Sequence, residues 1–403
     1  MKEIGTLAGQ LFISKKSLKS REHLNNLVNL RPRAAKKVHA ILLFNIRHNV
    51  AFLSPNGYTM DMSPLSSKID LAKQKETWLF RHEFLKSIRN FFDAKGFVEI
   101  DTPILVPNPG LEPNLEYFST TFKPQMNDTQ QRTLFLATSP EYHLKKALAS
   151  GLDKIFEITS SFRNGEISPK HEPEFLMLEW YRHPGNYMDI ARDGHDLFHS
   201  LAKQFSKSPE DWASPETISV CEAFQEFAAI DLESLLSENP ADLGQLNLPL
   251  AKVARAAGHT EISEDWSFDD AFNALIVSKI EPALSKKKLV LLQDYPSSQA
   301  ALSRPKSSKP YLCERFEIYF EGVELANAFG ELTDSAEQRR RCLEDINKRK
   351  ALYPNDPTPE VDESFLTALD HLDQAGGIAL GIERLMMCMI GSQDLGDVRP
   401  FRL

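Results

Sequence analysis

The segment from residue 156 to residue 182 holds the densest group of side chains that could do chemistry. Two apolar, strand-like stretches, Phe156–Ile158 and Phe175–Leu178, flank a polar turn that carries Arg163, Glu166, His171 and Glu174. The planar guanidinium of an arginine can hold a phosphate through two parallel hydrogen bonds, and a nearby histidine can donate to an outer phosphate. A hairpin with this set at its tip is suited to a nucleoside triphosphate, although each residue taken alone is more often an ordinary surface charge.

A second group consists of two glutamates on another predicted hairpin. Glu317 and Glu324 flank a turn at Glu321-Gly322, so their strands can bring them close together. Two carboxylates that share a site repel each other unless a cation lies between them, and Mg²⁺ bridging nucleotide phosphates is the natural one. Judged by spacing alone, a pair of exposed hairpin carboxylates is the more frequent arrangement.

The third group lies where a glycine-punctuated strand, Gly376–Gly381, passes directly into a helix, Ile382–Ile390. Small residues let a ligand approach the backbone, and the start of a helix directs N–H groups toward anions. Arg384 would project from the first turn and could cover a purine by cation–π stacking. A Gly-x-x-Arg sequence is weak evidence without the other two groups.

The elements that must position these groups predict an α+β fold. Apolar periodicity indicates a helix over Lys73–Ala94, ended by Gly96, and a strand over Val98–Thr102, ended by Pro103. Further elements are expected as a helix at Glu141–Ala149, strands at Leu289–Gln293, Glu314–Phe320 and Val323–Phe329, and a charged helix at Ala336–Leu352. Because hairpins and long insertions separate the strands, the pattern favours an antiparallel sheet flanked by helices over a doubly wound one.

Composition is typical of a globular, cytoplasmic protein. The 403 residues are 42% hydrophobic and 26% charged, and they have room for two or three domains or for one large domain with an appendage. No apolar run approaches the roughly 18 residues of a membrane span, and the N-terminus lacks the pattern of a secretory signal. The four cysteines are scattered without metal-type spacing, which indicates reduced packing residues.

Charge divides the chain unevenly. Residues 1–75 contain 13 Lys and Arg against 4 Asp and Glu, whereas the whole chain has a net charge of −9. We expect a small basic module at 1–72, possibly β-rich, with strands at Val38–Phe44 and Ala51–Ser54, and a catalytic domain at 73–403. The basic head fits an anionic partner such as a nucleic acid or an acidic protein, and it fits equally well a module whose charges only keep it soluble.

Taken together, the three groups resemble the signature motifs of class II aminoacyl-tRNA synthetases. TPILVP (102–107) resembles motif 1, FRNGE…HEPEF (162–175) motif 2, and GIERL (381–385) motif 3, in matching order and spacing from about Thr77 to Leu403. The resemblance implies the antiparallel class II sheet, a homodimer formed through motif 1, and activation of an amino acid by ATP with Mg²⁺.

Within that class the sequence is similar to the lysyl branch, through TSPEYHLKKALASG, HEPEFLMLEWY and ERFEIYFEGVELANAFGELTD. Ser139, Ala379 and PSSQAALS (296–303) resemble instead the elongation factor P–(R)-β-lysine ligases, which are truncated relatives of that branch. An added methyl group on a pocket floor, at Ala379, can change substrate preference by only about 1–3 kcal/mol.

The resemblance also implies roles for individual residues. Arg163 would bind the α-phosphate and His171 the outer phosphates, Phe175 and Arg384 would enclose the adenine, and Glu317 and Glu324 would hold Mg²⁺; Asn164, Glu166, Leu325 and Gly381 complete the expected ATP site. Glu331 and Tyr181 would receive the terminal ammonium of lysine, and Glu141 with Ser139 the other amino group; Pro140, Asn327 and Ala379 complete the expected amino-acid pocket. Arg163 and Arg384 are the expected catalytic residues.

Three positions depart from the pattern. Gly165 stands where the relatives have a glutamate, and we expect Glu166 to replace it through a small shift of the loop. Glu172 replaces the asparagine of HNPEF, and Ala328 replaces the glycine of NGF.

The expected function is ATP-dependent activation of (R)-β-lysine or lysine as an adenylate and its transfer to a lysine of elongation factor P. Two alternatives remain at this point. One is a lysyl-type enzyme that charges tRNA, with the basic module as its RNA-binding part. The other is a catalytically silent paralogue that binds adenylates and regulates, which the retention of Arg163, Arg384 and Glu331 argues against.

Overall fold

The structure, a computed structural model, describes residues 44–46, 49–53, 59–61, 71–124, 131–238 and 248–402. The chain divides into two compact units, Met1–Asp70 and Leu71–Leu403. In the first unit, β1 (Phe44–Ile46), β2 (Asn49–Leu53) and β3 (Thr59–Asp61) form an antiparallel sheet in that order. Of the strands predicted here, β2 overlaps Ala51–Ser54, whereas Val38–Phe44 lies outside the described residues except for its last position.

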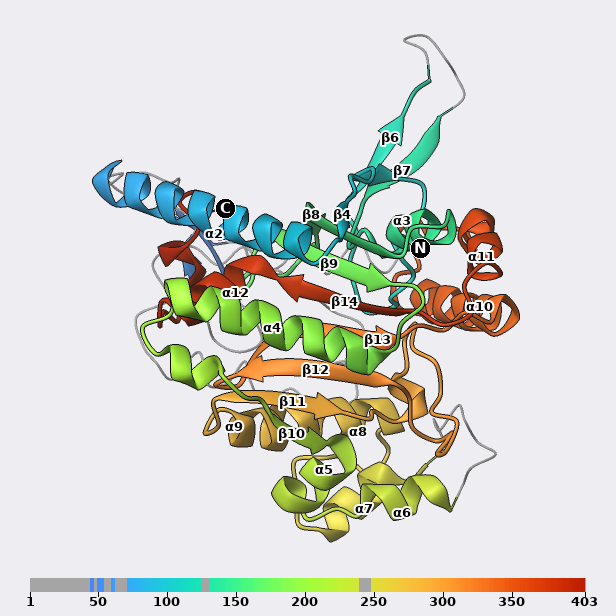
Figure 1. The fold of residues 1–403 in the computed structure, drawn as a ribbon. Coiled ribbons are helices and arrows are strands. Elements are labelled where there is room, and N and C mark those ends of the chain that lie inside the picture. The colour runs from blue at the N-terminus through green and yellow to red at the C-terminus, as the bar shows by residue number, and fades with distance from the viewer. Residues whose placement is uncertain are drawn as a thin grey trace. The chain divides into compact units, whose positions relative to one another are not determined.

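An eight-stranded sheet forms the centre of the second unit, in the order β10-β11-β12-β13-β14-β9-β8-β4 (Figure 1). Its strands are β4 (Val98–Glu99), β8 (Lys154–Phe162), β9 (Glu174–Arg182), β10 (Glu216–Ser219), β11 (Leu289–Gln293), β12 (Arg315–Phe320), β13 (Val323–Gly330) and β14 (Gly376–Gly381). The neighbours from β11 to β8 are all antiparallel, and the two outermost pairs are parallel. The predicted antiparallel α+β fold is confirmed.

Helices cover the sheet and fill the insertions between its strands. They are α2 (Leu71–Ala94), α3 (Glu141–Ala149), α4 (Tyr187–Phe205), α5 (Val220–Ala228), α6 (Leu232–Ser237), α7 (Leu250–Ala256), α8 (Phe268–Leu275), α9 (Glu281–Leu284), α10 (Ser335–Leu352), α11 (Glu363–Leu369) and α12 (Ile382–Met389), with short helices at Pro209–Trp212, Ile276–Ile280, Ser297–Gln299 and Leu395–Asp397. Across the described ranges, we find no helix with the length and apolar character that crossing a membrane requires.

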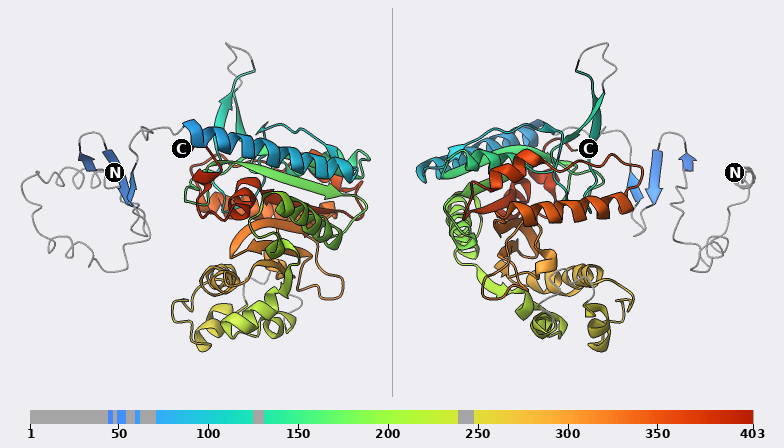
Figure 2. Two further views of the ribbon diagram at one scale, coloured as in Figure 1. Left: turned by 60° about the vertical axis from the view of Figure 1, so that its left-hand side comes forward. Right: turned by 90° about the vertical axis from the view of Figure 1, so that its right-hand side faces the viewer.

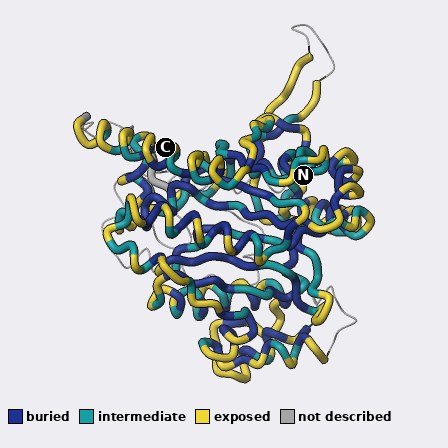
Figure 3. Tube along the Cα trace, viewed as in Figure 1, coloured by how far each residue is buried: buried dark blue, intermediate teal, exposed yellow. Residues whose placement is uncertain are grey.

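The main core lies between one face of the sheet and the helices α2 and α4, which cross it in Figure 1. Phe84, Phe92 and Phe198 from these helices pack against the strand residues Trp180 and Ile318, and all are essentially buried. The strands are accordingly buried through the middle of the unit (Figure 3). Because this face is filled by apolar packing, only the opposite face can hold a polar site.

Two smaller parts are attached to this frame. A second apolar core lies at the β10–β11 edge, where α5 to α9 pack together. A three-stranded sheet of β5 (Leu105–Val106), β7 (Arg132–Leu136) and β6 (Ser119–Phe122) begins within TPILVP (102–107), and its β6–β7 part projects from the unit (Figure 2). The strand predicted over Val98–Thr102 is shorter than expected, because Thr102 uses its N–H to bind the Glu157 carboxylate instead of a neighbouring strand.

Candidate active site

The sheet register aligns five positions directly across the polar face. Glu317 on β12 pairs with Asn327, Asn327 with Ala379, Ala379 with Glu179, and Glu179 with Glu157 on β8. Residues directly opposite each other in a sheet point to the same side, so this row forms the floor of a site. A cavity of about 230 Å³ lies over it, lined by Asn327, Ala379 and Glu179 among others.

A β-bulge in β13 places Glu324 and Asn327 on the same face. Ile318 pairs with Ala326 but Tyr319 pairs with Glu324, so Leu325 is the extra residue. Strict alternation would turn Glu324 away from Asn327, three positions later; the additional residue places both on the cavity side. Glu317 and Glu324 already share a face because Glu324 pairs with Tyr319, two positions from Glu317; the bulge is what brings Asn327 onto that face as well.

One end of the cavity is a buried charge network on α3 and the segment after β13. Lys145 Nζ lies 2.6 Å from Glu141 Oε1 and 2.5 Å from Glu331 Oε2, and the side chains of Lys145 and Glu331 are each 1% exposed. Burial alone would lower the pKa of Lys145, but the two carboxylates outweigh it and raise that pKa. Burial raises the pKa of Glu331 although Lys145 opposes the shift. Glu331 Oε1 has no hydrogen-bond partner in the described part of the chain.

Glu179 and Tyr181 continue this end along β9. The Tyr181 hydroxyl donates to Glu179 Oε2 at 2.8 Å, while Glu179 Oε1 is buried with no hydrogen-bond partner among the described residues. Burial, followed by the charge of Glu141, raises the pKa of Glu179 well above its ordinary value. Gly377, opposite Tyr181, must be glycine, because a Cβ there would collide with the Tyr181 ring and with Glu331 Oε1. This end of the cavity therefore holds buried carboxylate oxygens for which the described residues provide no hydrogen-bond donor.

The other end is carried by the loop between β8 and β9. Gly165 has φ of +79°, a conformation that glycine adopts without strain, and the turn brings Glu166 to the cavity wall. Arg163 stacks on Phe175, with 5.3 Å from its Cζ to the ring centre, and its buried Nε has no hydrogen-bond partner in the described ranges. The Arg163 guanidinium therefore offers an N–H group without a protein partner, as an anion site requires.

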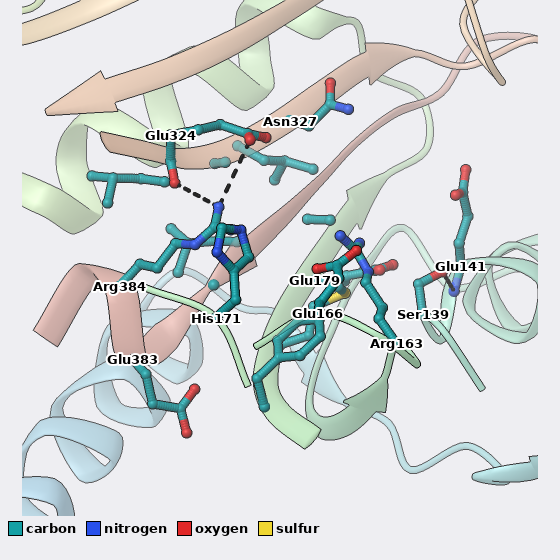
Figure 4. Close-up of a pocket in the computed structure, with 18 of the residues that line it drawn as sticks. Ser139, Glu141, Arg163, Glu166, His171, Glu179, Glu324, Asn327, Glu383 and Arg384 are labelled. Atoms are coloured by element: carbon teal, nitrogen blue, oxygen red, sulfur yellow. Dashed lines mark hydrogen bonds and ion pairs between the residues drawn. The ribbon is translucent and has the colours of Figure 1, made fainter. Parts of the chain in front are cut away.

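Arg384 and His171 touch each other across this end. Arg384 donates to His171 Nε2 at 2.5 Å and to the Glu324 backbone oxygen at 3.0 Å, and it lies 3.7 Å from the Glu324 carboxylate. Burial and then the charge of Arg384 lower the pKa of His171, which keeps the ring neutral and able to accept. Figure 4 shows this group at one end of the site, Ser139 and Glu141 at the other, and Arg163 between them.

The two glutamates of the second hairpin differ in their surroundings. Glu317 is buried, and its carboxylate accepts from Arg315 and from the Tyr319 hydroxyl, both at 2.6 Å. The Glu324 side chain is 41% exposed, yet enclosure by the protein and then the charge of Glu317 raise the pKa of Glu324 to about 7. Among the described residues no group of three or more His, Cys, Asp or Glu side chains is placed to hold a metal ion.

Most of the predicted site residues meet in this one cavity. Those that line it are Ser139, Glu141, Arg163, Glu166, His171, Phe175, Tyr181, Glu324, Leu325, Asn327, Ala379, Gly381 and Arg384. Pro140 instead is the N-cap residue of α3, and Asn164 pairs its backbone with Glu116. Glu317 is buried and is not among the residues that line the cavity. Glu331 reaches the cavity's charge network through Lys145.

Two of the three unusual positions have a structural explanation. Glu172 is 3% exposed and forms an ion pair with Arg402, which also donates to Asp394 at 2.6 Å. The C-terminal segment thereby holds the β8–β9 loop, and a carboxylate replaces the expected amide because a cation faces it. Ala328 is fully buried in the core on the opposite face of the sheet and does not touch the cavity.

Sequence reasoning missed several functional candidates. Glu179 is a carboxylate inside the otherwise apolar stretch Leu176–Tyr181, which is a signal of a buried functional group, and Glu383 lies within GIERL but was assigned no role. Glu383 accepts from Arg81, Arg399 and the Leu176 N–H, so it ties α2, β9 and the C-terminus together below the site. Lys145 carried no such signal, since lysine on a helix is usually exposed.

Comparison with known proteins agrees with this geometry. The family described as tRNA synthetases class II (D, K and N) matches residues 66–402. The chain belongs to this family. It is also similar to proteins named elongation factor P–(R)-β-lysine ligase: 36% identical over 325 residues to that of Haemophilus influenzae (strain PittGG), and 34% over 328 residues to that of Histophilus somni (strain 2336). These alignments cover 80% and 81% of this chain and 94% of each relative.

Proposed function

We propose that this protein is an ATP-dependent ligase that activates (R)-β-lysine, or lysine, as an adenylate and transfers it to a lysine side chain of elongation factor P. The relatives that carry this activity in their names match over almost their whole length. Within the site, the main observation in favour of the proposal is that the buried carboxylates around Lys145 outnumber this one cation.

The charge of the amino-acid end fits a substrate with two ammonium groups. Glu141, Glu179 and Glu331 contribute three carboxylates and Lys145 one cation, so two negative charges remain when all are ionised. A buried charge without a partner is costly, and a substrate that brings two cations removes that cost. Glu331 and Tyr181 receive the terminal ammonium, and Glu141, Ser139 and Glu179 the other amino group.

The nucleotide end fits ATP. Arg163 binds the α-phosphate, His171 the outer phosphates, and Phe175 and Arg384 enclose the adenine once Arg384 leaves His171. Glu166, supported by the Gly165 turn, takes the place of the glutamate that the relatives have one residue earlier. Asn164, Leu325 and Gly381 supply backbone around the nucleotide.

Mg²⁺ would be held by Glu324 together with the charge of Glu317. Glu324 is partly open to the cavity, whereas both oxygens of Glu317 already accept hydrogen bonds. Two carboxylates suffice because an ion bound to nucleotide phosphates completes its shell with phosphate oxygens and water. The ion would neutralise charge on the phosphates.

The chemistry has two steps. The substrate carboxylate attacks the α-phosphorus of ATP, the bond to the β-phosphate oxygen breaks, and pyrophosphate leaves with the bonding electrons. The acceptor ammonium first loses one proton, and the neutral amine then attacks the acyl carbon. The bond to the AMP oxygen breaks and AMP leaves with that electron pair. The nitrogen then loses a second proton to solvent as the amide forms. Positioning and charge stabilisation account for such catalysis, with no covalent enzyme intermediate.

The test is the transfer of radiolabelled (R)-β-lysine and α-lysine, with ATP, to elongation factor P and to total tRNA in parallel. We expect label on the protein, with β-lysine favoured. Label on tRNA with α-lysine would instead identify a compact lysyl-type synthetase, with its basic N-terminal part as the RNA-binding module. Absence of ATP–pyrophosphate exchange with either amino acid would overturn the proposal in favour of a binding-only regulator.

A further inference from the structure

A second cavity, which we call the side cavity, continues from the active site. Its volume is about 730 Å³, and it shares Glu112, Ser139, Glu141 and Phe329 with the cavity described above. Its other walls come from the loop 106–115, the first turn of α3, the segment 297–302 and one side of α10. The activation chemistry proposed above uses none of these outer walls, so the side cavity has room for a further reactant.

The side cavity meets the active site beside Arg163. Glu112 lines both cavities and Arg163 lines the first. Asn164, next to Arg163, pairs its backbone with Glu116, four positions from Glu112. Since Arg163 is the proposed α-phosphate ligand, the junction lies next to the place where the acyl–AMP bond is made. A group that passes Glu112 from the side cavity therefore arrives at the reacting carbon rather than at the adenine.

The arginines of the side cavity are already neutralised by ion pairs, whereas Glu112 and Asp345 are not. Arg315 pairs with Glu317, and Arg340 and Arg341 both pair with Glu337. By contrast, the carboxylates of Glu112 and Asp345 form no ion pair with any described residue, and Asp269 and Lys348, which also line the side cavity, form none either.

Electrostatics at these two carboxylates favour an incoming cation. Burial and the neighbouring Glu112 raise the pKa of Asp345 to about 6, although Lys348 opposes the shift. Enclosure by the protein and, more weakly, the charge of Glu141 raise the pKa of Glu112, although Arg163 opposes the shift and the residue is exposed on one side. An entering cation would relieve both repulsions.

A buried amide supplies a separate indication of a ligand. Gln338 on α10 lines the side cavity, is 1% exposed, and its carbonyl Oε1 has no hydrogen-bond partner in the described part of the chain. Buried acceptors are nearly always satisfied in folded proteins, so an orphan at a cavity wall indicates a missing donor. A carbonyl oxygen can only accept, which again specifies an N–H or O–H group.

We propose that the side cavity receives the lysine side chain of the acceptor protein, with Glu112 and Asp345 facing its ammonium and Gln338 accepting one of its hydrogens. This inference rests on the proposed ligase function and names the route of its second substrate. The ammonium gives up one proton, through these carboxylates to water, before the amine attacks the acyl carbon and AMP departs as described above.

The same charges disfavour the 3′ end of a tRNA. Its phosphates would face Glu112 and Asp345, and the cavity's arginines are already paired, so few cations remain to neutralise them. The ammonium of a lysine side chain is neither repelled by these carboxylates nor in need of cations to neutralise it.

The test compares substitutions at Asp345 with the same substitutions at Asp356, an exposed residue beyond the C-terminal end of α10. In the full-length enzyme we expect Asp345→Asn to lower kcat/KM for elongation factor P about tenfold, as loss of one charge-assisted hydrogen bond implies, and Asp345→Lys to lower it further. ATP–pyrophosphate exchange should stay within about twofold, because Asp345 lies outside the adenylate cavity. Asp356→Asn and Asp356→Lys should change neither rate.

Equal transfer by the Asp345 and Asp356 variants would overturn the inference, and so would a parallel loss of exchange and transfer at Asp345. If the wild-type enzyme labels only tRNA, the proposed function fails first; an increase of tRNA labelling by Asp345→Lys would then assign the side cavity to RNA. Gln338→Met is the second variant, since it keeps the buried volume but removes the acceptor, and it should lower transfer by severalfold with exchange unchanged.

Discussion

The two ends of the active site are built in different ways. The amino-acid end stands on β9, β14 and α3, its charged groups are almost fully buried, and Lys145 already fills part of it. The nucleotide end stands on the β8–β9 loop and the first turn of α12, and its groups contact one another where the proposed ligand would lie. One end is a buried pocket with more carboxylates than cations, and the other is a set of side chains that must rearrange to admit the proposed ligand.

This difference predicts which substitutions affect stability as well as activity. A group fixed in a buried network stabilises the fold, so its loss is felt in both quantities. A loop residue whose polar groups have few partners in the protein contributes little to the stability of the fold, so its substitution should affect activity alone. We therefore expect substitutions at the proposed amino-acid end to lower stability as well as activity, and substitutions at the proposed nucleotide end to lower activity alone.

The largest effect on activity is expected for Arg163→Ala. Loss of the guanidinium removes the charge that faces the α-phosphate, and ATP–pyrophosphate exchange should fall about 10³-fold. The midpoint of urea unfolding should stay unchanged, because Arg163 lies on the loop and its Nε has no protein partner among the described residues. A variant with near-normal exchange would contradict the phosphate role, and one that unfolds early would contradict the contrast between the two ends.

Glu331→Gln should affect both properties. Lys145 would keep only Glu141, so we expect a loss of about 2–3 kcal/mol in the free energy of unfolding and a rise of about 100-fold in KM for the amino acid. Urea titration and exchange kinetics measure the two effects. Glu166→Gln is the matched control at the nucleotide end: it should leave stability unchanged, and equal stability of both variants would remove the contrast.

Binding of the diamino acid should release protons. In the free enzyme, burial raises the pKa of Glu331 to about 7, so this group is partly protonated near neutral pH, and burial also raises the pKa of Glu179. Ammonium groups stabilise the ionised forms and lower both pKa values, so affinity should rise with pH, by up to about tenfold per unit, until the carboxyls are ionised. Calorimetry in buffers of different ionisation enthalpy should show release of about one proton; no buffer dependence would contradict the charge argument.

The smallest effect is expected at the pocket floor. Ala379→Gly removes one methyl group between Asn327 and Glu179, and the ratio of kcat/KM for β-lysine over α-lysine should fall about tenfold. Competition between the two labelled amino acids in exchange measures this ratio. An unchanged ratio would mean that the floor does not select, and that the choice is made by the charged walls.

Much of the site could be predicted from short segments. Arg163, Glu166, His171 and Phe175 lie within one hairpin, and Gly381 and Arg384 within one strand–helix junction, so local patterns were enough to propose them. Motif order then placed these segments in one sheet. The residues that were missed have a common feature. Glu179 and Lys145 matter because they are buried beside other charged groups, and the sequence alone does not reveal that burial.

Local chemistry, set by the sequence itself, therefore determined which segments form hairpins and helices and which of them carry a guanidinium, a carboxylate or a flexible glycine. Only the tertiary structure decided how these groups combine. The register that aligns Glu179 with Ala379, the bulge that brings Asn327 onto the face of Glu324, and the pairing of Glu172 with Arg402 all join positions far apart in the chain or depend on one extra residue. Such contacts arise from packing and long-range pairing, because a shift of one residue in a strand reverses the direction of every side chain that follows.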